Sequence, residues 1–158
     1  MASGRATEEI NDFDDLLCNL PYKHKVVVAG NQDLLFESKP EQVKEHLSNA
    51  VYLQDSGVTL ERLNFWGCPV TPFLPYMAFA VERGAASKRH WDKIPQTTDV
   101  LITHGPPFGI LDKEDIVASH MRCEQLGRAV QRVRPKLHVF GHVHGGYGAR
   151  RAQTGPAL

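Results

Sequence analysis

Three short loops in this chain of 158 residues contain polar side chains that could bind a metal ion. They are Gly30-Asn31-Gln32-Asp33, Thr103-His104-Gly105-Pro106 and Gly141-His142-Val143-His144. Their amide, imidazole and carboxylate groups form a mixed nitrogen and oxygen ligand set, which suits Zn, Mn, Fe or Co better than thiophilic metals. His142 and His144 project to one side of an extended segment, where a shared cation explains two imidazoles better than packing does. The sequence therefore predicts a metal site wherever these loops meet.

Each loop directly follows a short apolar segment with the composition of a buried β-strand, at 25–29, 99–103 and 137–140. Other segments of the chain have the apolar spacing of helices or the short apolar runs of strands. We expect helices over 7–20, 40–48 and 118–133, and further strands over 51–53, 58–60 and 63–67. This alternation predicts an α/β fold, in which loops at the carboxyl ends of neighbouring parallel strands converge on one site.

The composition is that of a soluble globular protein, with 42% hydrophobic and 23% charged residues, and it predicts one domain over residues 1–158. Lysine plus arginine equals aspartate plus glutamate at 18 each, so we expect no sequence-independent binding of nucleic acid. There is no apolar run of membrane-spanning length and no signal-like start, so we expect a cytoplasmic or nuclear protein without a membrane partner. The cysteines, at 18, 68 and 123, form no Cys-x-x-Cys pair and are expected to be reduced and mostly buried.

Some residues have two interpretations at this stage. Asp33 either positions a metal ligand without contacting the metal itself or caps the following helix, and the sequence favours neither. Arg150 and Arg151 either bind phosphate or form a solvated tail, and we expect the tail. Two further groups are also expected to be structural. They are the aromatic residues Trp66, Phe73 and Tyr76, which could instead line a pocket, and the histidines His24, His46, His90, His120 and His138.

The order of the three loops resembles that of the calcineurin-like metallophosphoesterase superfamily, whose motifs include Gly-Asn-His-Asp/Glu, a lone His and Gly-His-x-His. The segments 19–22, 51–56, 101–107 and 133–141 are similar to those of one branch, the metallophosphoesterase-domain-containing (MPPED-type) proteins. The resemblance runs from about residue 8 to residue 148. It implies a β-sandwich flanked by helices and a phosphoesterase that uses divalent metals, such as Mn, Zn, Fe or Mg. By the same resemblance, Asn31, His104 and His142 bind one metal ion and His144 binds a second.

This chain departs from the family pattern in two ways. The Asp-x-His and Gly-Asp-x-x-Asp motifs, which supply the bridging aspartate, are not in the sequence, so we expect the first strand and some C-terminal strands to be missing and metal binding to be weakened. Gln32 occupies the position of the catalytic histidine, and glutamine cannot transfer a proton at neutral pH. General acid–base catalysis typically speeds a reaction by about 10²–10⁴-fold, so we expect Gln32 to slow turnover by a factor of about that order.

We therefore expect a phosphodiesterase, of cyclic-nucleotide or similar type, with weak or no activity. Its substrate would be a small phosphoester or a nucleotide. Two alternatives remain open at this stage. One is a non-catalytic relative that binds a metal ion, a nucleotide or a protein partner. The other is a fragment of a longer, active protein.

Overall fold

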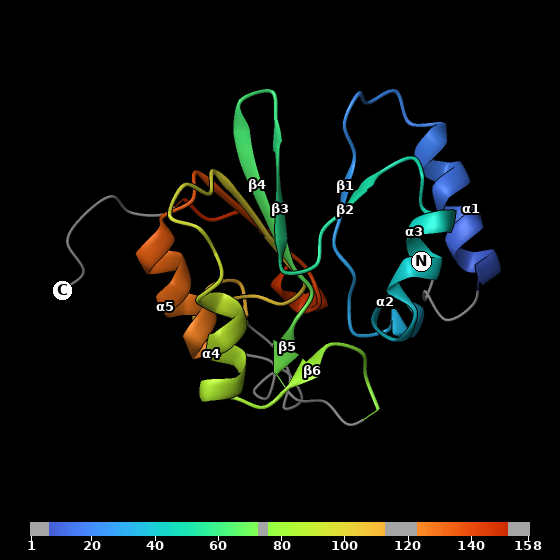
Figure 1. Cartoon of the computed structure of the whole chain (residues 1–158). Helices are drawn as coiled ribbons and strands as arrows, with labels where there is room; N and C mark the ends of the chain where they lie inside the picture. The colour runs from blue at the N-terminus through green and yellow to red at the C-terminus, as the bar shows by residue number, and fades with distance from the viewer. Residues whose placement is uncertain (1–6, 73–75, 113–122, 152–158) are drawn as a thin grey trace.

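The structure is a computed structural model that describes residues 7–72, 76–112 and 123–151 (Figure 1). Phe73, His120 and the first part of the predicted helix 118–133 lie outside these ranges. Helices and strands are mixed along the chain, as expected for an α/β fold. In order they are α1 (Thr7–Cys18), β1 (Val26–Val27), α2 (Leu34–Ser38), α3 (Pro40–His46), β2 (Val51–Tyr52), β3 (Ser56–Leu60), β4 (Leu63–Cys68), β5 (Thr71–Pro72), β6 (Ala80–Val81), α4 (Ala85–Trp91), β7 (Val100–Thr103), α5 (Glu124–Val133), β8 (Leu137–Phe140) and the 3₁₀ turn η2 (His144–Gly146).

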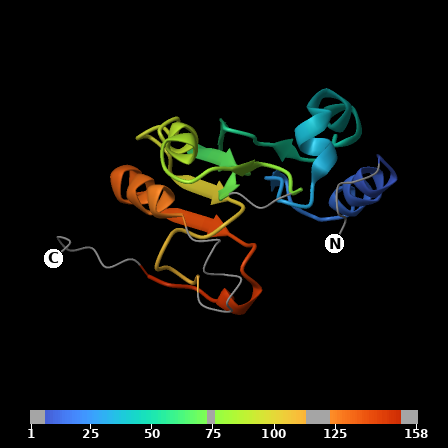
Figure 2. The same cartoon turned by 90° about the horizontal axis from the view of Figure 1, so that it is seen from below.

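The largest sheet has four strands in the order β3-β4-β7-β8. β3 and β4 are antiparallel, whereas β4, β7 and β8 run parallel. The loops that follow β7 and β8 therefore lie at the same edge of the sheet, at the carboxyl ends of these strands. Helices α4 and α5 lie along one side of this sheet (Figure 2). The fully buried Leu101 of β7 and Leu126 of α5 belong to the core cluster between these layers, and Trp66 packs against it. The predicted helix over 118–133 is confirmed from Glu124 to Val133 as α5, whereas Cys123 is extended and is the N-cap of the helix.

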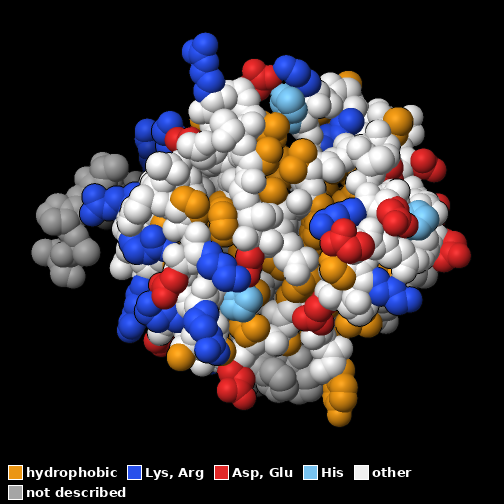
Figure 3. All heavy atoms as spheres, in the orientation of Figure 1, with side chains coloured by type: hydrophobic (Ala, Val, Ile, Leu, Met, Phe, Trp, Pro, Cys, Tyr) orange, Lys and Arg blue, Asp and Glu red, His pale blue; other side chains and the backbone are white. Residues whose placement is uncertain are grey.

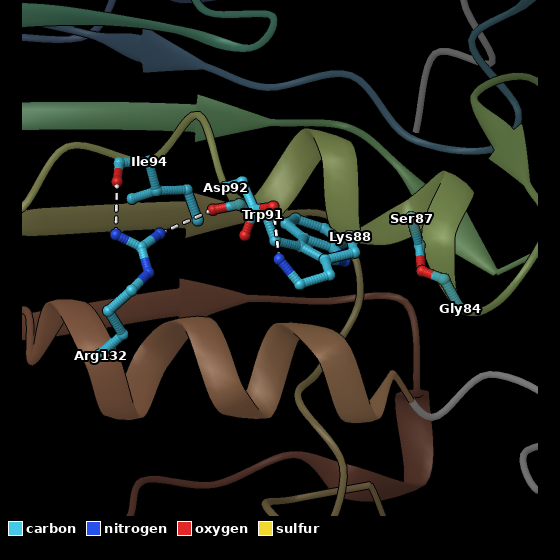
Figure 4. A network of polar contacts seen from close by, with 7 residues as sticks. All are labelled: Gly84, Ser87, Lys88, Trp91, Asp92, Ile94 and Arg132. Atoms are coloured by element: carbon cyan, nitrogen blue, oxygen red, sulfur yellow. Dashed lines mark hydrogen bonds and ion pairs between the residues drawn. The ribbon is translucent and has the colours of Figure 1, made fainter.

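Helix α4, which the sequence did not predict, is held against α5 by one arginine (Figure 4). The guanidinium of Arg132 donates hydrogen bonds to the backbone oxygens of Trp91, at 2.9 Å, and Ile94, at 3.2 Å. The side chain of Trp91 is only 1% exposed and fills the core below this contact. The two bonds satisfy the carbonyl of the last residue of α4 and a carbonyl in the turn that follows the helix.

The first part of the chain forms a second layer, in which β1 and β2 pair in parallel and helices α1, α2 and α3 pack on them (Figure 1). The predicted helices over 7–20 and 40–48 are confirmed as α1 and α3. The buried carboxylate of Asp14 in α1 accepts hydrogen bonds from Ser48 Oγ, at 2.9 Å, and from the backbone and side chain of Asn49, both at 2.8 Å. These bonds fasten α1 to the end of α3.

The expectation that segment 25–29 is a buried central strand beside β7 and β8 is wrong. Within the described ranges, its strand β1 pairs with β2 and with no strand of the large sheet, and its two residues are half-buried. The β1–β2 layer instead contacts the large sheet at Gly67, where a β-carbon would come within 2.4 Å of Leu53 Cβ and 2.7 Å of Val28 Cγ2. The absence of a side chain at Gly67 therefore allows the two layers to meet.

Two other expectations of burial are corrected. β8 is the edge strand of its sheet among the described residues, so Leu137 and Val139 are 54% and 47% exposed instead of buried. Tyr76 is 99% exposed and does not fill the core, whereas Trp66 does pack against it. Of the cysteines, 68 and 123 are buried and 18 is exposed, and all three are free thiols.

The surface carries both signs of charge, unevenly distributed (Figure 3). On the face drawn, lysine and arginine predominate on the side of α4 and α5, and aspartate and glutamate on the side of α1 and α3. Equal totals of charge thus hide a partial separation. Within residues 7–72, 76–112 and 123–151, no helix is long and apolar enough to cross a membrane.

Candidate metal centre

The loop after β1 and the loop after β7 meet through Asn31 and His104. His104 Nε2 donates a hydrogen bond to Asn31 Oδ1 across 2.8 Å, between residues 73 positions apart in the sequence. The close contact between the two loops depends on the missing side chain of Gly30, because a β-carbon there would lie 2.5 Å from His104 Cε1. The predicted convergence of these two loops is confirmed, although it is produced by the packing of two layers and not by neighbouring strands of one sheet.

The loop after β8 adds a second imidazole beside His104. The rings of His104 and His142 contact edge to face, with centroids 4.6 Å apart and planes inclined by 63°. The backbone N–H of Gly141 donates to the oxygen of His104 at 2.9 Å, which joins the two loops just before His142. His142 has a φ of 69°, a left-handed conformation that is uncommon for a residue with a side chain and clusters at functional sites.

His144 lies farther from this cluster. It begins the turn η2 and is exposed. Its effect on the site is electrostatic, because it helps to lower the pKa of His142. Among the described residues, no three His, Cys, Asp or Glu side chains are grouped closely enough to hold a metal ion. The structure therefore brings together Asn31, His104 and His142, and leaves His144 beside them as a separate imidazole.

Asp33 supports the loop that carries Asn31. Its carboxylate accepts a hydrogen bond from the backbone N–H of Gly30 at 2.6 Å, and its own N–H donates to the Gly30 oxygen at 3.1 Å. It occupies the N-cap position of α2, but its side chain accepts no hydrogen bond from that helix. Burial raises the pKa of the Asp33 carboxyl, the Gly30 N–H lowers it, and Glu9 raises it further, with a net increase. Of its two interpretations, the contacts favour support of the loop.

Met77 is a residue of this site that the sequence did not indicate. Asn31 Nδ2 and Gln32 Nε2 each lie 3.5 Å from its sulfur, and the backbone N–H of Ala78 donates to the backbone oxygen of Asn31 at 2.9 Å. With its amide nitrogen turned towards the sulfur, Asn31 directs its oxygen at His104. Because Met77 is 46 residues from Asn31 and lies in no recognisable motif, no local signal could have found it.

Comparison with known proteins identifies the family. No family model matches the chain. Human metallophosphoesterase domain-containing protein 1 is 39% identical to it over 164 aligned positions, which cover 89% of this chain. UPF0046 protein T07D4.2 of Caenorhabditis elegans is 36% identical over 170 positions, with the same coverage. The chain belongs to the metallophosphoesterase-domain-containing family. It spans about half the length of the relatives it matches, 50% of the human protein and 43% of the nematode one.

A solved structure supports the fold of this metallophosphoesterase-family chain. It aligns with a TM-score of 0.65 over 87% of this chain and 57% of its own, at 16% sequence identity. At this identity the likeness concerns the fold alone. It shows that the mixed α/β arrangement of layers described above recurs in a known protein.

Family membership implies the use of a divalent metal, and the electrostatics of the site are compatible with one. Burial, and secondarily the neighbouring His142, lower the pKa of His104 to about 4, while burial and then His144 lower the pKa of His142. Both imidazoles are therefore neutral at pH 7, the form in which histidine binds metals. The side-chain oxygen of Asn31 lies beside them, so the three donors that meet here are all uncharged and of the nitrogen and oxygen types that Zn or Mn accept.

Proposed function

We propose that this chain is a metal-dependent phosphoesterase domain that binds one divalent ion weakly and hydrolyses phosphodiesters slowly or not at all. The observation that supports the metal site is the 2.8 Å approach of Asn31 Oδ1 and His104 Nε2, with the ring of His142 beside them. Donors this close could bind a single ion together, provided that the ion replaces their hydrogen bond and the hydrogen on His104 Nε2 moves to Nδ1. Small phosphodiesters or cyclic nucleotides are the proposed substrates.

The proposed ligands are Asn31, His104 and His142 for one ion, with His144 available to a second. A divalent ion bound here would act as a Lewis acid on a phosphoryl oxygen and as a source of nucleophilic hydroxide. The residues of this chain contribute orientation: Asp33 closes the loop of Asn31, and Met77 turns its amide. Weak affinity is proposed because the three donors are uncharged, and a carboxylate ligand would add an attraction that amides and imidazoles lack.

Slow hydrolysis is proposed because of Gln32. Its side chain is exposed and lies 3.5 Å from the Met77 sulfur, so it is near the metal ligands but has no group that titrates near neutral pH. A glutamine can hold a phosphoryl oxygen by a hydrogen bond. It cannot give a proton to a leaving group, which is the step that a histidine at this position would assist.

The first experiment measures metal content and turnover of the purified chain. We expect calorimetric titration with Zn²⁺ or Mn²⁺ to give at most one ion per chain, and bis(p-nitrophenyl) phosphate with added Mn²⁺ to be hydrolysed near the background rate. His104→Ala should abolish binding, whereas His46→Ala, which removes a half-buried imidazole bonded to Asn11 and away from the three loops, should preserve it. Two tightly bound ions with robust turnover would contradict the proposal of weak activity, and absence of binding would contradict the metal site.

The second experiment restores histidine at position 32. We expect Gln32→His to raise turnover by up to about 10²-fold at unchanged metal affinity, because it adds proton transfer and removes no proposed ligand. Gln32→Ala serves as the control for loss of the side chain alone. Equal turnover in the Gln32→His and Gln32→Ala variants would contradict a catalytic importance of this position.

A second candidate function is a non-catalytic relative that binds a metal ion, a nucleotide or a protein partner. Gln32 favours it, since the residue preserves hydrogen bonding at the site without acid–base chemistry. Calorimetry with a nucleoside monophosphate in the presence of Mn²⁺ distinguishes the two functions. Saturable binding with no turnover of any tested phosphodiester by wild type or Gln32→His would favour the non-catalytic function.

A further inference from the structure

A buried hydroxyl links β8 to the turn that carries His104. Thr103, the last residue of β7, is 2% exposed, and its Oγ1 donates a hydrogen bond to the backbone oxygen of Gly105 at 2.8 Å. The same Oγ1 lies 2.8 Å from Nε2 of His138 in β8. The hydroxyl therefore joins an imidazole on one strand to a carbonyl on the far side of His104.

The number of hydrogens fixes the direction of this chain of bonds. A threonine hydroxyl has one hydrogen, and that of Thr103 is directed at the Gly105 oxygen. His138 Nε2 must then carry a hydrogen and donate it to the lone pair of Oγ1. Burial lowers the pKa of His138 to about 4, so the ring is neutral at pH 7 and is held in the Nε2–H tautomer. His138 is thus a donor of defined orientation.

A second bond connects the same two segments on the other side of His104. The N–H of Gly141, three residues after His138, donates to the His104 oxygen at 2.9 Å. The turn of His104 is therefore attached to β8 and its following loop at two points, one through a side chain and one through the backbone. Because the following loop also carries His142, these attachments set the positions of both imidazoles relative to each other.

We propose that His138 and Thr103 are positioning residues of the metal centre, which fix the Gly105 carbonyl and so hold the His104 imidazole against Asn31 and His142. This inference rests on the proposed function, since it assigns a purpose to the position of His104. Neither residue is a proposed metal ligand. Partners one step removed from a metal ligand affect metal affinity by about 10–100-fold when they are lost.

The test compares Thr103→Val, which loses the hydroxyl at nearly constant volume, with Thr103→Ser, which retains it. We expect Thr103→Val to weaken Zn²⁺ or Mn²⁺ binding by about tenfold and Thr103→Ser to restore it to near the wild-type value. His138→Leu should behave like Thr103→Val, and His138→Gln, whose Nε2 can donate, should be less affected. Equal affinities for the valine and serine variants would overturn the proposal.

A measurement without metal separates this inference from the proposed function. Nitrogen-15 NMR of the metal-free wild type should show His138 as the Nε2–H tautomer, and the His104 resonances should shift in Thr103→Val but not in Thr103→Ser. An Nδ1–H tautomer for His138, or unchanged His104 resonances in the valine variant, would overturn the inference even if that variant proves too unstable for titration. If the wild type binds no metal, the proposed function fails while these resonances still decide the positioning role.

Discussion

Replacement of Gly30 by alanine should displace His104 and so disrupt the proposed metal centre, at a modest cost in stability. The new β-carbon would lie 2.5 Å from His104 Cε1 and 2.7 Å from Nδ1, whereas ordinary contacts are 3.4–4 Å. The ring therefore has to recede by about 0.9 Å or turn, and either movement stretches its 2.8 Å bond to Asn31. A displacement of about 1 Å in a preorganised site can cost about 10²-fold in function.

The assays for Gly30→Ala are metal titration and unfolding in urea. We expect the affinity for Zn²⁺ or Mn²⁺ to fall by at least about tenfold, and the free energy of unfolding to fall by about 1–3 kcal/mol, as for other overpacked positions. Gly127→Ala, in helix α5 and away from the three loops, is the control, because the nearest atoms that its β-carbon would meet among the described residues outside the helix backbone are those of Phe108 at 4.0 Å. If the two variants bind metal equally well, the close approach of Gly30 and His104 is not what organises the site.

Further substitutions test the packing and the ion pairs. Burial raises the pKa of Asp55, but Cys68, Lys93 and His90 together lower it below the ordinary value of 3.8, so its stabilisation is present above that pH and lost as the pH falls through the lowered pKa. Asp55→Asn should lower the free energy of unfolding by about 1–3 kcal/mol at pH 7 and by less below pH 3.8, as measured by urea unfolding across pH; an effect constant with pH would contradict this. In the same assay, Leu126→Ala should lower the free energy of unfolding by about 2–5 kcal/mol, and Leu137→Ala, at a half-exposed position, by under about 0.5 kcal/mol. Equal losses in the two variants would show that the buried core does not lie around Leu126. Gly67→Ala should cost about 1–3 kcal/mol by separating the two layers, and an unchanged midpoint of unfolding would show that they do not meet there.

The sequence predicted that Asn31, His104 and His142 would meet, but neither how the fold brings them together nor that His144 would lie apart from them. Asn31 and His104 were expected to converge as loops of neighbouring parallel strands, and they do converge. The strand before Asn31, however, belongs to a separate layer. Apolar β-branched runs identify a strand, yet they do not specify which strand it pairs with, because pairing depends on residues far away in the chain.

Other features left no local signal in the sequence. Gly67 acts through the side chain that it lacks, and its neighbours Val28 and Leu53 are known only from the fold. The apolar run of β8 looked buried because burial at a sheet edge depends on whether another element covers it. Met77 contributes through a thioether that has many roles in proteins, so its residue type alone is not informative.

The most direct test of the proposed metal centre is anomalous X-ray scattering from crystals grown with saturating Zn²⁺ or Mn²⁺. The proposal predicts one strong peak within bonding distance of Asn31 Oδ1 and His104 Nε2, with the ring of His142 turned towards it, and a clearly weaker peak in Gly30→Ala crystals soaked at the same subsaturating metal concentration as wild-type crystals. A peak bound elsewhere on the chain, or none between these side chains at saturation, would contradict the assignment of these three loops as a metal site.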